Sequence, residues 1–488
     1  MQILFKQNIL KMNQHNFHSS IIRAYDIRGI YGKTLNDNDA FFVAKSFASF
    51  LKKNGKNKIS VACDGRLSSP ALKAELIRGL VESGLEVIDV GLGPTPMLYF
   101  SVYHLEMDAG IMVTGSHNPK DHNGFKIMLK ERPFYGEDIL GLAKIAAEGD
   151  FVTGQGSIEE EDIKEEYVDR MLSDCILAES ESHLLDEVDS FKPQKDLRIA
   201  WDNGNGAAGD IMIRLSERIA AEHILLYSDI DGTFPNHHPD PTVPENLVAL
   251  KKVVIEQACD IGIAFDGDGD RIGVMDNKGE ILWGDQLMVF YAREILRAKR
   301  GSTIIADVKA SSVLFNEIAK AGGKPLMWKT GHSLVKAKMK ETKAPLAGEM
   351  SGHIFFADKY YGFDDALYAA IRIINIVACS KDPLSLMRKT MPQTHSTPEI
   401  RIECSEERKF AIVEELKVNL KQSGVVFNDI DGIRVSENGG WWLIRASNTQ
   451  PVLVARCEAK TKKELQELKK SLKAQLQFCQ VEIPKELR

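Results

Sequence analysis

Short apolar stretches alternate with longer amphipathic segments over most of the chain, which predicts strands and helices that follow one another in an α/β fold. Three stretches share one order: an apolar strand, an aspartate, a loop and a helix. They begin near Lys58, Leu197 and Thr303, and the aspartates are Asp64, Asp202 and Asp307. In each unit a second strand follows, and a third apolar segment ends in a polar loop, TGSHNP, DGDGDR or GEMSGH. Ligands of parallel sheets bind outside the carboxyl ends of the strands, so we expect three related units to bring these loops to one cleft.

The C-terminal part of the chain departs from this repeat. Short strands separated by NDIDG and ENGG turns lie between predicted helices over 407–421 and 461–478, which indicates a separate α+β domain. The segment 174–195 is rich in Ser, Glu and Asp and is predicted to be a solvated insertion. We therefore predict three related α/β domains with mixed sheets and a C-terminal α+β domain around a central cleft. The ranges are a leader at 1–18, then 19–162, 163–280, 281–392 and 393–488.

The composition of the chain argues against several classes of protein. The chain has 488 residues, a formal net charge of −7 and 44% hydrophobic residues, which excludes global disorder and argues against a nucleic-acid binder. No apolar run is long enough for a transmembrane helix, and the N-terminus lacks the apolar stretch of a secretory signal. Seven scattered cysteines without a C-x-x-C pair indicate a reduced cytoplasm rather than disulfides or a zinc site. We expect a cytoplasmic protein with no membrane or nucleic-acid partner.

Asp266, Asp268 and Asp270 alternate with glycine directly after the apolar strand IGIAF. In an extended chain alternate side chains share a face, so the three carboxylates would converge and repel one another unless a cation lay among them. Oxygen ligands favour Mg²⁺, Mn²⁺ or Ca²⁺ over zinc. An EF-hand is excluded, because Arg271 and Asn277 occupy the positions that need Gly and Glu. We predict a divalent metal site; the alternative is an acidic turn without metal.

Ser116 follows another apolar strand, AGIMV, between Gly115 and the sequence HNP. It does not fit the G-x-S-x-G nucleophile motif, because Thr114 occupies the first glycine position. In an extended segment Ser116 and His117 would point apart, which argues against a serine-hydrolase pair. The serine is either part of a polar turn or an acceptor for a phosphoryl group, which would add oxygen ligands for a metal.

Three further groups of polar residues are candidates for binding. Arg445, Ser447, Asn448 and Thr449 form a dense set of donors that suits a phosphate, although an ordinary polar hairpin would have the same composition. Glu349 and Ser351 could bind vicinal sugar hydroxyls or belong to a satisfied turn. TGHS around His332, Asp307-Val-Lys309 and the lone Arg28 are weaker signals.

Taken together these motifs resemble the α-D-phosphohexomutase superfamily, and within it the bacterial phosphomannomutase/phosphoglucomutase group. YDIRG, SHNP followed by NGFK, DGDGDR, TGHS, GEMSGH and RASNT occur in the order of the family and span Tyr25 to Thr449. The resemblance implies four domains around one cleft, in agreement with the repeat. The sequence departs from the family at Gly115, where Ala is usual, and at Asp121-His122, where Tyr is common. The leader and the 174–195 segment have no family counterpart.

The resemblance implies a role for each matching residue. Ser116 would be phosphorylated, and Asp266, Asp268 and Asp270 would hold Mg²⁺ together with it. The catalytic groups around the phosphoserine and the reacting end of the substrate would be Arg28, His117, Lys126, Lys309 and His332. Glu349 and Ser351 would bind the sugar 3- and 4-hydroxyls. Further substrate contacts would come from Tyr25, Arg271 and Gly331, and the distal phosphate would be held by Arg445, Ser447, Asn448 and Thr449.

The activity implied is a Mg²⁺-dependent phosphohexomutase. It would interconvert mannose 1- and 6-phosphate, and also glucose 1- and 6-phosphate, through a hexose 1,6-bisphosphate that serves as intermediate and activator. Its partners would be small sugar phosphates, and it would be a monomer or weak dimer. Two alternatives stay open. One is a phosphoglucosamine mutase, although that group typically carries Gln where this chain has Met350. The other is a non-catalytic sugar-phosphate binding protein on the same scaffold.

Overall fold

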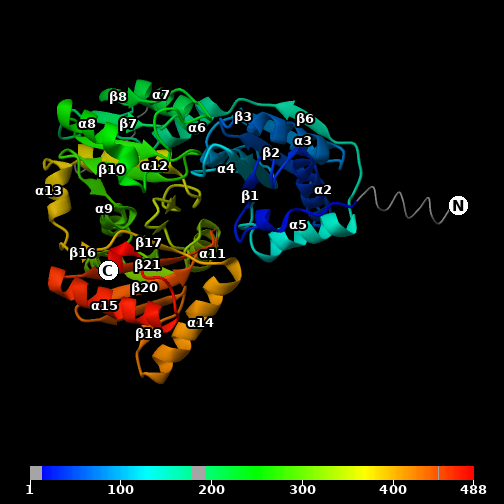
Figure 1. Cartoon of the computed structure of the whole chain (residues 1–488). Helices are drawn as coiled ribbons and strands as arrows, with labels where there is room; N and C mark the ends of the chain where they lie inside the picture. The colour runs from blue at the N-terminus through cyan, green and yellow to red at the C-terminus, as the bar shows by residue number, and fades with distance from the viewer. Residues whose placement is uncertain (1–13, 179–192, 449, 488) are drawn as a thin grey trace.

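The computed structural model describes residues 14–178, 193–448 and 450–487, and it contains four sheets, one in each of four consecutive domains (Figure 1). In Figure 1 the first domain is blue and cyan, the second is green at the top, and the fourth is orange and red. The prediction of three α/β domains followed by an α+β domain is confirmed. Among the described residues, no helix is long and apolar enough to cross a membrane.

The first domain is built on a mixed six-stranded sheet in the order β1-β5-β4-β2-β3-β6. Its strands are β1 (Ile27–Ile30), β2 (Lys58–Cys63), β3 (Glu86–Leu92), β4 (Ala109–Val113), β5 (His122–Leu129) and β6 (Ser157–Glu160). Its helices are η1 (Ser19–Ile21), α2 (Asp37–Lys53), α3 (Ser69–Val81), α4 (Thr95–His104) and α5 (Glu137–Glu148). Pro70 near the start of α3 is favourable because the first turn needs no backbone donor there.

The second domain has a five-stranded sheet in the order β11-β10-β9-β7-β8. Its strands are β7 (Arg198–Asp202), β8 (Glu222–Leu226), β9 (Ile261–Phe265), β10 (Ile272–Asp276) and β11 (Ile281–Leu282), so the sheet extends two residues beyond the predicted boundary at 280. Its helices are α6 (Lys164–Leu172), α7 (Gly209–Arg218), η3 (Pro244–Leu247) and α8 (Val248–Glu256).

The third domain has a four-stranded sheet in the order β13-β12-β14-β15. Its strands are β12 (Thr303–Asp307), β13 (Lys324–Trp328), β14 (Leu346–Gly348) and β15 (Ile354–Phe356). Its helices are α9 (Gly284–Ala298), α10 (Ser312–Lys320), α11 (His332–Thr342), α12 (Ala366–Ala378) and α13 (Leu384–Lys389).

The predicted repeat appears in the strand pairing of these three domains. The central strands β2, β7 and β12 each pair in parallel with two neighbours, β3 and β4, β8 and β9, and β13 and β14. The last strand of each trio then pairs antiparallel with the strand that follows it, β5, β10 or β15. The loops TGSHNP, DGDGDR and GEMSGH all lie in this last connection, so equivalent topology places them at equivalent edges.

The fourth domain is antiparallel throughout and has a core of its own. Its strands are β16 (His395–Ser396), β17 (Ile400–Glu403), β18 (Phe427–Asn428), β19 (Ile433–Glu437), β20 (Gly440–Ala446) and β21 (Val452–Ala459). The helices α14 (Glu406–Gln422), α15 (Lys462–Phe478) and η4 (Lys485–Leu487) complete it. A separate hydrophobic cluster fills this domain, whereas one continuous cluster links parts of the other three.

One sequence prediction needs correction at the start of the second domain. Residues 174–178 are not a solvated insertion, because Cys175, Leu177 and Ala178 are buried in the main hydrophobic cluster. Residues 179–192 lie outside the described residues, as do residues 1–13 of the predicted leader. The described end of that leader packs on α2: His15 Nε2 lies 2.7 Å from Asp39 Oδ1 and the His15 ring stacks on Phe42.

Candidate active site

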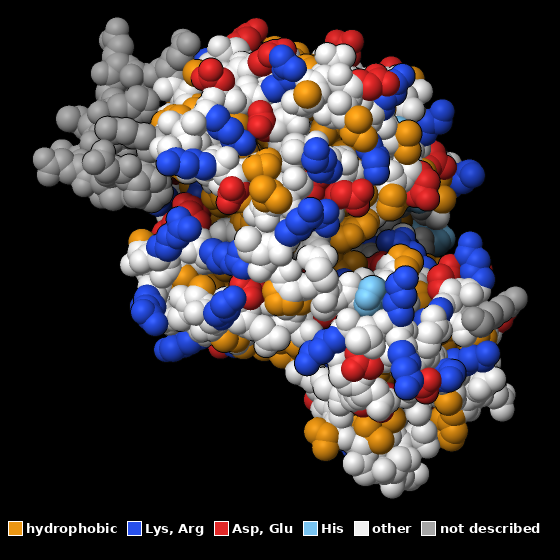
Figure 2. Space-filling model, turned by 90° about the vertical axis from the view of Figure 1, so that its left-hand side faces the viewer, with side chains coloured by type: hydrophobic (Ala, Val, Ile, Leu, Met, Phe, Trp, Pro, Cys, Tyr) orange, Lys and Arg blue, Asp and Glu red, His pale blue; other side chains and the backbone are white. Residues whose placement is uncertain are grey.

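A pocket of about 630 Å³ lies between the four domains, and side chains from each of them line it. Figure 2 shows Lys and Arg side chains, with a histidine, around a hollow across this face of the molecule. Asp266, Asp268 and Asp270 are buried and do not line the pocket, but most of the other residues that the sequence singled out do. They are Tyr25, Arg28, Ser116, His117, Lys126, Arg271, Lys309, Gly331, His332, Glu349, Ser351, Arg445, Ser447 and Asn448. Thr449 lies outside the described residues.

Ser116 stands in the loop between β4 and β5 with a φ of 50°, a left-handed conformation that is uncommon for a residue with a side chain. The prediction that Ser116 and His117 point apart is wrong, because the loop turns here instead of continuing the strand. Ser116 Oγ lies 3.3 Å from His117 Nδ1 and 3.3 Å from Asp266 Oδ2. Burial and the nearby cations Arg271 and Arg28 hold the pKa of His117 well below its ordinary value.

Arg66, which sequence reasoning missed, fixes the conformation of this loop. Its guanidinium is buried and donates to four backbone carbonyls, those of Ser116, Asn118, Pro119 and His122. Its Nε donates to Asp64 Oδ2 at 3.2 Å. Gly115 leaves room for the guanidinium, since an added Cβ would lie 2.5 Å from Arg66 Cζ. A dense set of contacts therefore holds the serine in place.

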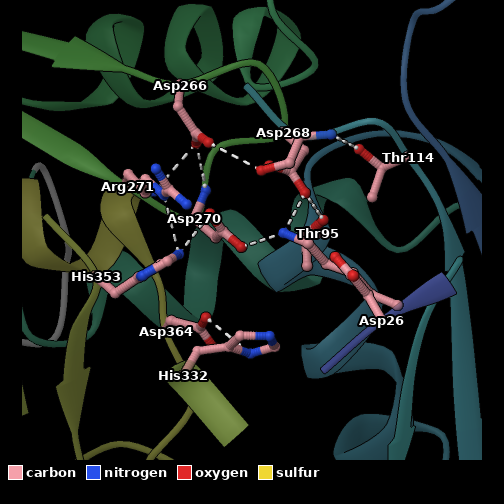
Figure 3. Close-up of polar contacts among 12 residues, drawn as sticks. Asp26, Thr95, Thr114, Asp266, Asp268, Asp270, Arg271, His332, His353 and Asp364 are labelled. Atoms are coloured by element: carbon pink, nitrogen blue, oxygen red, sulfur yellow. Dashed lines mark hydrogen bonds and ion pairs between the residues drawn. The ribbon is translucent and has the colours of Figure 1, made fainter. Parts of the chain in front are cut away.

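The acidic triad converges as predicted, but through a turn and not through an extended strand. Asp266, Asp268 and Asp270 are fully buried and offer oxygens that lie within 4.8 Å of one another (Figure 3). Gly269 makes the turn possible with a φ of 72°. The first domain holds this loop, because Thr95 at the start of α4 donates from N to the Asp268 carbonyl at 2.8 Å.

The triad has the oxygen ligands of a divalent cation site, and its buried carboxylates repel one another. Asp268 Oδ1 is buried without a hydrogen-bond partner among the described residues. Burial and the like charges of Asp270 and Asp268 raise the pKa of Asp266 well above its ordinary value. Lys126 Nζ lies 2.7 Å from Asp268 Oδ2 and also ion-pairs with Asp270. Burial would lower the pKa of Lys126, but these carboxylates outweigh it and raise that pKa.

Glu349, Ser351 and His353 form a hydrogen-bonded group that touches the triad, since His353 Nε2 lies 3.2 Å from Asp270 Oδ1. Glu349 Oε1 accepts from Gly331 N at 2.5 Å, and Oε2 lies 2.8 Å from His353 Nδ1. Ser351 Oγ lies 3.3 Å from Glu349 Oε2. Burial opposes a charge on His353, but the carboxylates of Asp270 and Glu349 raise its pKa to about 9. Sequence reasoning did not single out His353, although it closes the GEMSGH motif.

The predicted phosphate clamp lies at the end of β20 and reaches across the pocket to the first domain. Arg445 Nε donates to Asp431 Oδ2 at 2.9 Å, so an unpredicted carboxylate orients the guanidinium. Asn448 Nδ2 lies 2.5 Å from the Tyr25 hydroxyl, which in turn donates to Thr330 O at 3.0 Å. The first, third and fourth domains therefore meet at the clamp.

The remaining predicted cations each face a carboxylate. Lys309 Nζ lies 3.1 Å from Glu399 Oε2, a residue of the link into β17 that was not predicted. Burial opposes the charge of Glu399, but Lys309 and Arg401 lower its pKa to about 2. Arg28 ion-pairs with Asp26. The pocket lining thus contains Lys and Arg side chains together with the carboxylates that pair with them.

Models of four consecutive domains of one protein family match the chain. They are phosphoglucomutase/phosphomannomutase alpha/beta/alpha domain I over residues 19–152, domain II over 167–279, domain III over 283–395 and the C-terminal domain over 399–475.

Similar proteins cover nearly the whole chain. A phosphomannomutase/phosphoglucomutase of Pseudomonas aeruginosa is 42% identical over 96% of this chain and 97% of its own length. A phosphoglucomutase of Neisseria meningitidis serogroup A is 40% identical over 94% of this chain and 97% of its own. A crystal structure of a phosphoglucomutase/phosphomannomutase family protein from Burkholderia thailandensis, 41% identical, superposes with a TM-score of 0.87 over 96% of this chain and 100% of that chain.

Proposed function

The chain belongs to the phosphoglucomutase/phosphomannomutase family, and on that premise we propose that it interconverts hexose 1-phosphates and hexose 6-phosphates, with mannose and glucose as the sugars. The observation that carries the proposal is the position of Ser116. A buried serine hydroxyl 3.3 Å from Asp266, beside an acidic triad and open to a pocket with an arginine clamp, is arranged for phosphoryl transfer.

Asp266, Asp268 and Asp270 would hold a Mg²⁺ ion, with the phosphorylated Ser116 as a further ligand. The all-oxygen donor set and the unpartnered Asp268 Oδ1 fit such an ion. When bound, the cation would neutralise the charge that develops on the transferring phosphoryl group. Lys126 ion-pairs with two of these carboxylates, and a cation bound to them would free its ammonium group to face the phosphoryl oxygens.

In the transfer itself, the bond from phosphorus to Ser116 Oγ breaks while a bond to a sugar hydroxyl forms. That hydroxyl gives up its proton, and Ser116 Oγ ends protonated. His117 Nδ1, 3.3 Å from Oγ, is placed to exchange this proton, and Arg28 and Lys126 line the same wall. The product is a hexose 1,6-bisphosphate, and transfer of its other phosphate back to Ser116 completes the reaction.

The two half-reactions need the sugar in opposite orientations. One clamp made by Arg445, Ser447 and Asn448 would hold whichever phosphate is not reacting, so the same donors would serve both ends. Glu349 and Ser351 would bind the 3- and 4-hydroxyls. Since Glu349 is already oriented by Gly331 N and His353, it is a preorganised acceptor.

Initial rates test the function directly. Mannose 1-phosphate, glucose 1-phosphate and glucosamine 1-phosphate would each be supplied with Mg²⁺ and the matching hexose 1,6-bisphosphate as activator. We expect turnover of the first two. Faster turnover of glucosamine 1-phosphate would favour the phosphoglucosamine mutase alternative. Binding without turnover of any of the three would favour a sugar-phosphate binding protein.

Specificity among hexoses follows from the hydroxyls that the site addresses. Glucose and mannose differ only at carbon 2, and the residues proposed to bind the sugar address carbons 3 and 4. We predict that kcat/KM for the two 1-phosphates differs by about tenfold or less. Galactose 1-phosphate inverts the 4-hydroxyl and should react far more slowly, because Glu349 or Ser351 would be left badly paired. A ratio above a hundredfold between glucose and mannose would mean that other residues contact carbon 2.

We also propose a cytoplasmic location and a monomeric or weakly dimeric state. The support for the cytoplasm is the cysteine pattern, since all seven cysteines are free thiols in the structure.

A further inference from the structure

A second group of metal-ligating side chains lies beside the acidic triad, and the proposed function assigns no cation to it. Asp270, His353 and Asp364 are buried and each offers a ligand atom, and these atoms lie within 4.8 Å of one another. His332 Nδ1 lies 3.6 Å from Asp364 Oδ2 and adds a fourth donor. In Figure 3 the four side chains lie together below the rest of the triad.

Asp270 directs its two carboxylate oxygens to different clusters. Oδ2 ion-pairs with Lys126 inside the triad, whereas Oδ1 lies 3.2 Å from His353 Nε2. A cation in the second cluster would use Oδ1 and leave Oδ2 to the triad. The two sites can therefore share a residue without competing for the same oxygen.

Asp364 gives independent support for a cation in this cluster. The residue is fully buried, and its Oδ1 accepts from Lys336 Nζ at 2.9 Å. Its Oδ2 has no hydrogen-bond partner in the part of the chain that the structure describes, and neither has His332 Nδ1, which faces it. A buried carboxylate oxygen without a partner is costly, and a cation between Oδ2 and Nδ1 would satisfy both atoms.

The orientation of His353 fits the same role. Its Nδ1 lies 2.8 Å from Glu349 Oε2, which leaves Nε2 directed at Asp270. Histidines that ligate metals typically donate their other ring nitrogen to a carboxylate in this way. Arg271 Nε donates to Nε2 at 3.1 Å, and Lys336 ion-pairs with Asp364 through Oδ1. A metal ion on Nε2 and on Asp364 Oδ2 would displace Arg271 and leave the Lys336 pair in place.

We propose that Asp270, His332, His353 and Asp364 form a second site, for a divalent cation of the Zn²⁺ or Co²⁺ type. Mixed imidazole and carboxylate ligands suit such ions, whereas Mg²⁺ prefers the all-oxygen triad. Both histidines line the pocket, so the cation can enter from it. On the proposed function, a cation there would occupy part of the sugar site and inhibit the mutase.

Binding is measured on the full chain without any sugar phosphate, so the result does not depend on mutase activity. With Mg²⁺ in excess to fill the triad, we expect one equivalent of Co²⁺ to bind with visible d–d absorption that Zn²⁺ abolishes. Asp364→Asn and His332→Asn should each weaken Co²⁺ binding at least tenfold. Asp365→Asn is the matched control: it alters the adjacent buried aspartate, whose carboxyl accepts from Tyr167 and Tyr360, and should leave Co²⁺ affinity within twofold.

Zinc X-ray absorption should then show nitrogen and oxygen neighbours at about 2.0–2.1 Å, including two imidazoles. The proposal is overturned if no Co²⁺ binds in the presence of Mg²⁺, or if Mg²⁺ displaces Co²⁺ one for one and both variants bind it normally. If Asp364→Asn does not fold, His332→Asn decides the question, since His332 lies on the pocket wall.

Discussion

Arg66 is a charged side chain whose five N–H groups all point at protein oxygens. Four of them donate to backbone carbonyls of the Ser116 loop and the fifth to Asp64. The planar fork of a guanidinium can reach this many acceptors at fixed angles, which an ammonium cannot. Because Ser116 adopts a left-handed backbone conformation, we infer that Arg66 acts by positioning the serine and not by touching the substrate.

Arg66→Lys tests this positioning role. Lysine keeps the charge but has three donors, so at least one loop carbonyl would lose its partner. We predict that kcat falls about 10- to 100-fold while KM for the sugar phosphate stays within about threefold, as expected when only the reacting atom is misplaced. The control is Arg78→Lys on α3, where the arginine forms surface ion pairs with Glu75 and Glu82, lies over the Phe41 ring and does not line the pocket, and it should leave kcat unchanged. An equal rise in KM with normal kcat for Arg66→Lys would contradict the argument.

Ser116→Ala should lower mutase activity by at least two orders of magnitude, because it removes the proposed phosphoryl acceptor while the loop stays held by backbone contacts. Intact-protein mass spectrometry should show one phosphate on the active wild type and its loss with excess hexose monophosphate. Ser173→Ala, at an exposed serine after α6, should keep both activity and phosphate. Near-normal turnover by Ser116→Ala would exclude the assignment.

The residues that sequence could predict are those in compact motifs. The aspartate triad was predictable because its spacing alone concentrates charge, although a turn and not a strand brings the oxygens together. Arg66, Asp431 and Glu399 were not predictable, since each acts on a partner distant in the chain or on backbone atoms. The spacing of residues along the chain does not indicate such contacts.

At the scale of elements, the three α/β units were predictable because their central strands, β2, β7 and β12, are mostly buried and appear as short apolar runs. The strands β4, β9 and β14, which end at the functional loops, are buried along their whole length. The polar composition of 174–195 misled the prediction at its start, where a few apolar side chains pack into the core. The average composition of a segment does not reveal a few apolar residues that are buried at one end of it.

Helix α12 begins at a buried aspartate that joins it to α6. Asp365 Oδ1 accepts from Tyr368 N at 2.9 Å, and Oδ2 accepts from the hydroxyls of Tyr167 and Tyr360, each at 2.8 Å. Burial removes the carboxyl from water and raises its pKa to about 6, from an ordinary value of 3.8. Between these values the folded chain keeps a proton that the unfolded chain has lost, so this group's contribution to stability falls as pH rises.

Asp365→Asn should remove that dependence. Loss of carboxylate contacts to Tyr167 and Tyr360 should lower the stability of the variant at every pH. The difference in unfolding midpoint, variant minus wild type, should nevertheless be more positive at pH 7.5 than at pH 5. Expressed as free energy of unfolding, the difference between variant and wild type should change by about 1 kcal/mol between pH 5 and pH 7.5. Tyr167→Phe keeps the carboxyl and removes a hydrogen bond that lowers its pKa, so it should show a pH dependence in the same direction and at least as large as that of wild type. An equal offset at both pH values would refute the assignment.

At the scale of the whole molecule, the pocket exists only where four domains meet, and the fourth domain carries the clamp. Arg445→Ala should weaken binding of both the 1-phosphate and the 6-phosphate, because the clamp holds whichever end is not reacting. Loss of a charge-assisted contact of about 1.5–3 kcal/mol corresponds to roughly 10- to 150-fold in affinity. Binding titrations with each monophosphate check this, with Arg408→Ala on the exposed face of α14 as the control. An effect on one end alone would mean that the two ends use different sites.

The shared pocket also sets an order of events during protein synthesis. The serine lies early in the chain and the clamp arginine near its end, so at about 5–20 residues per second their emergence from the ribosome is separated by tens of seconds. Once β6 has emerged, the nascent polypeptide has a complete first domain but still lacks the residues that would bind the distal phosphate. Chains truncated anywhere before β20 would therefore be unable to hold the distal phosphate. Activity would appear only when the last domain has folded.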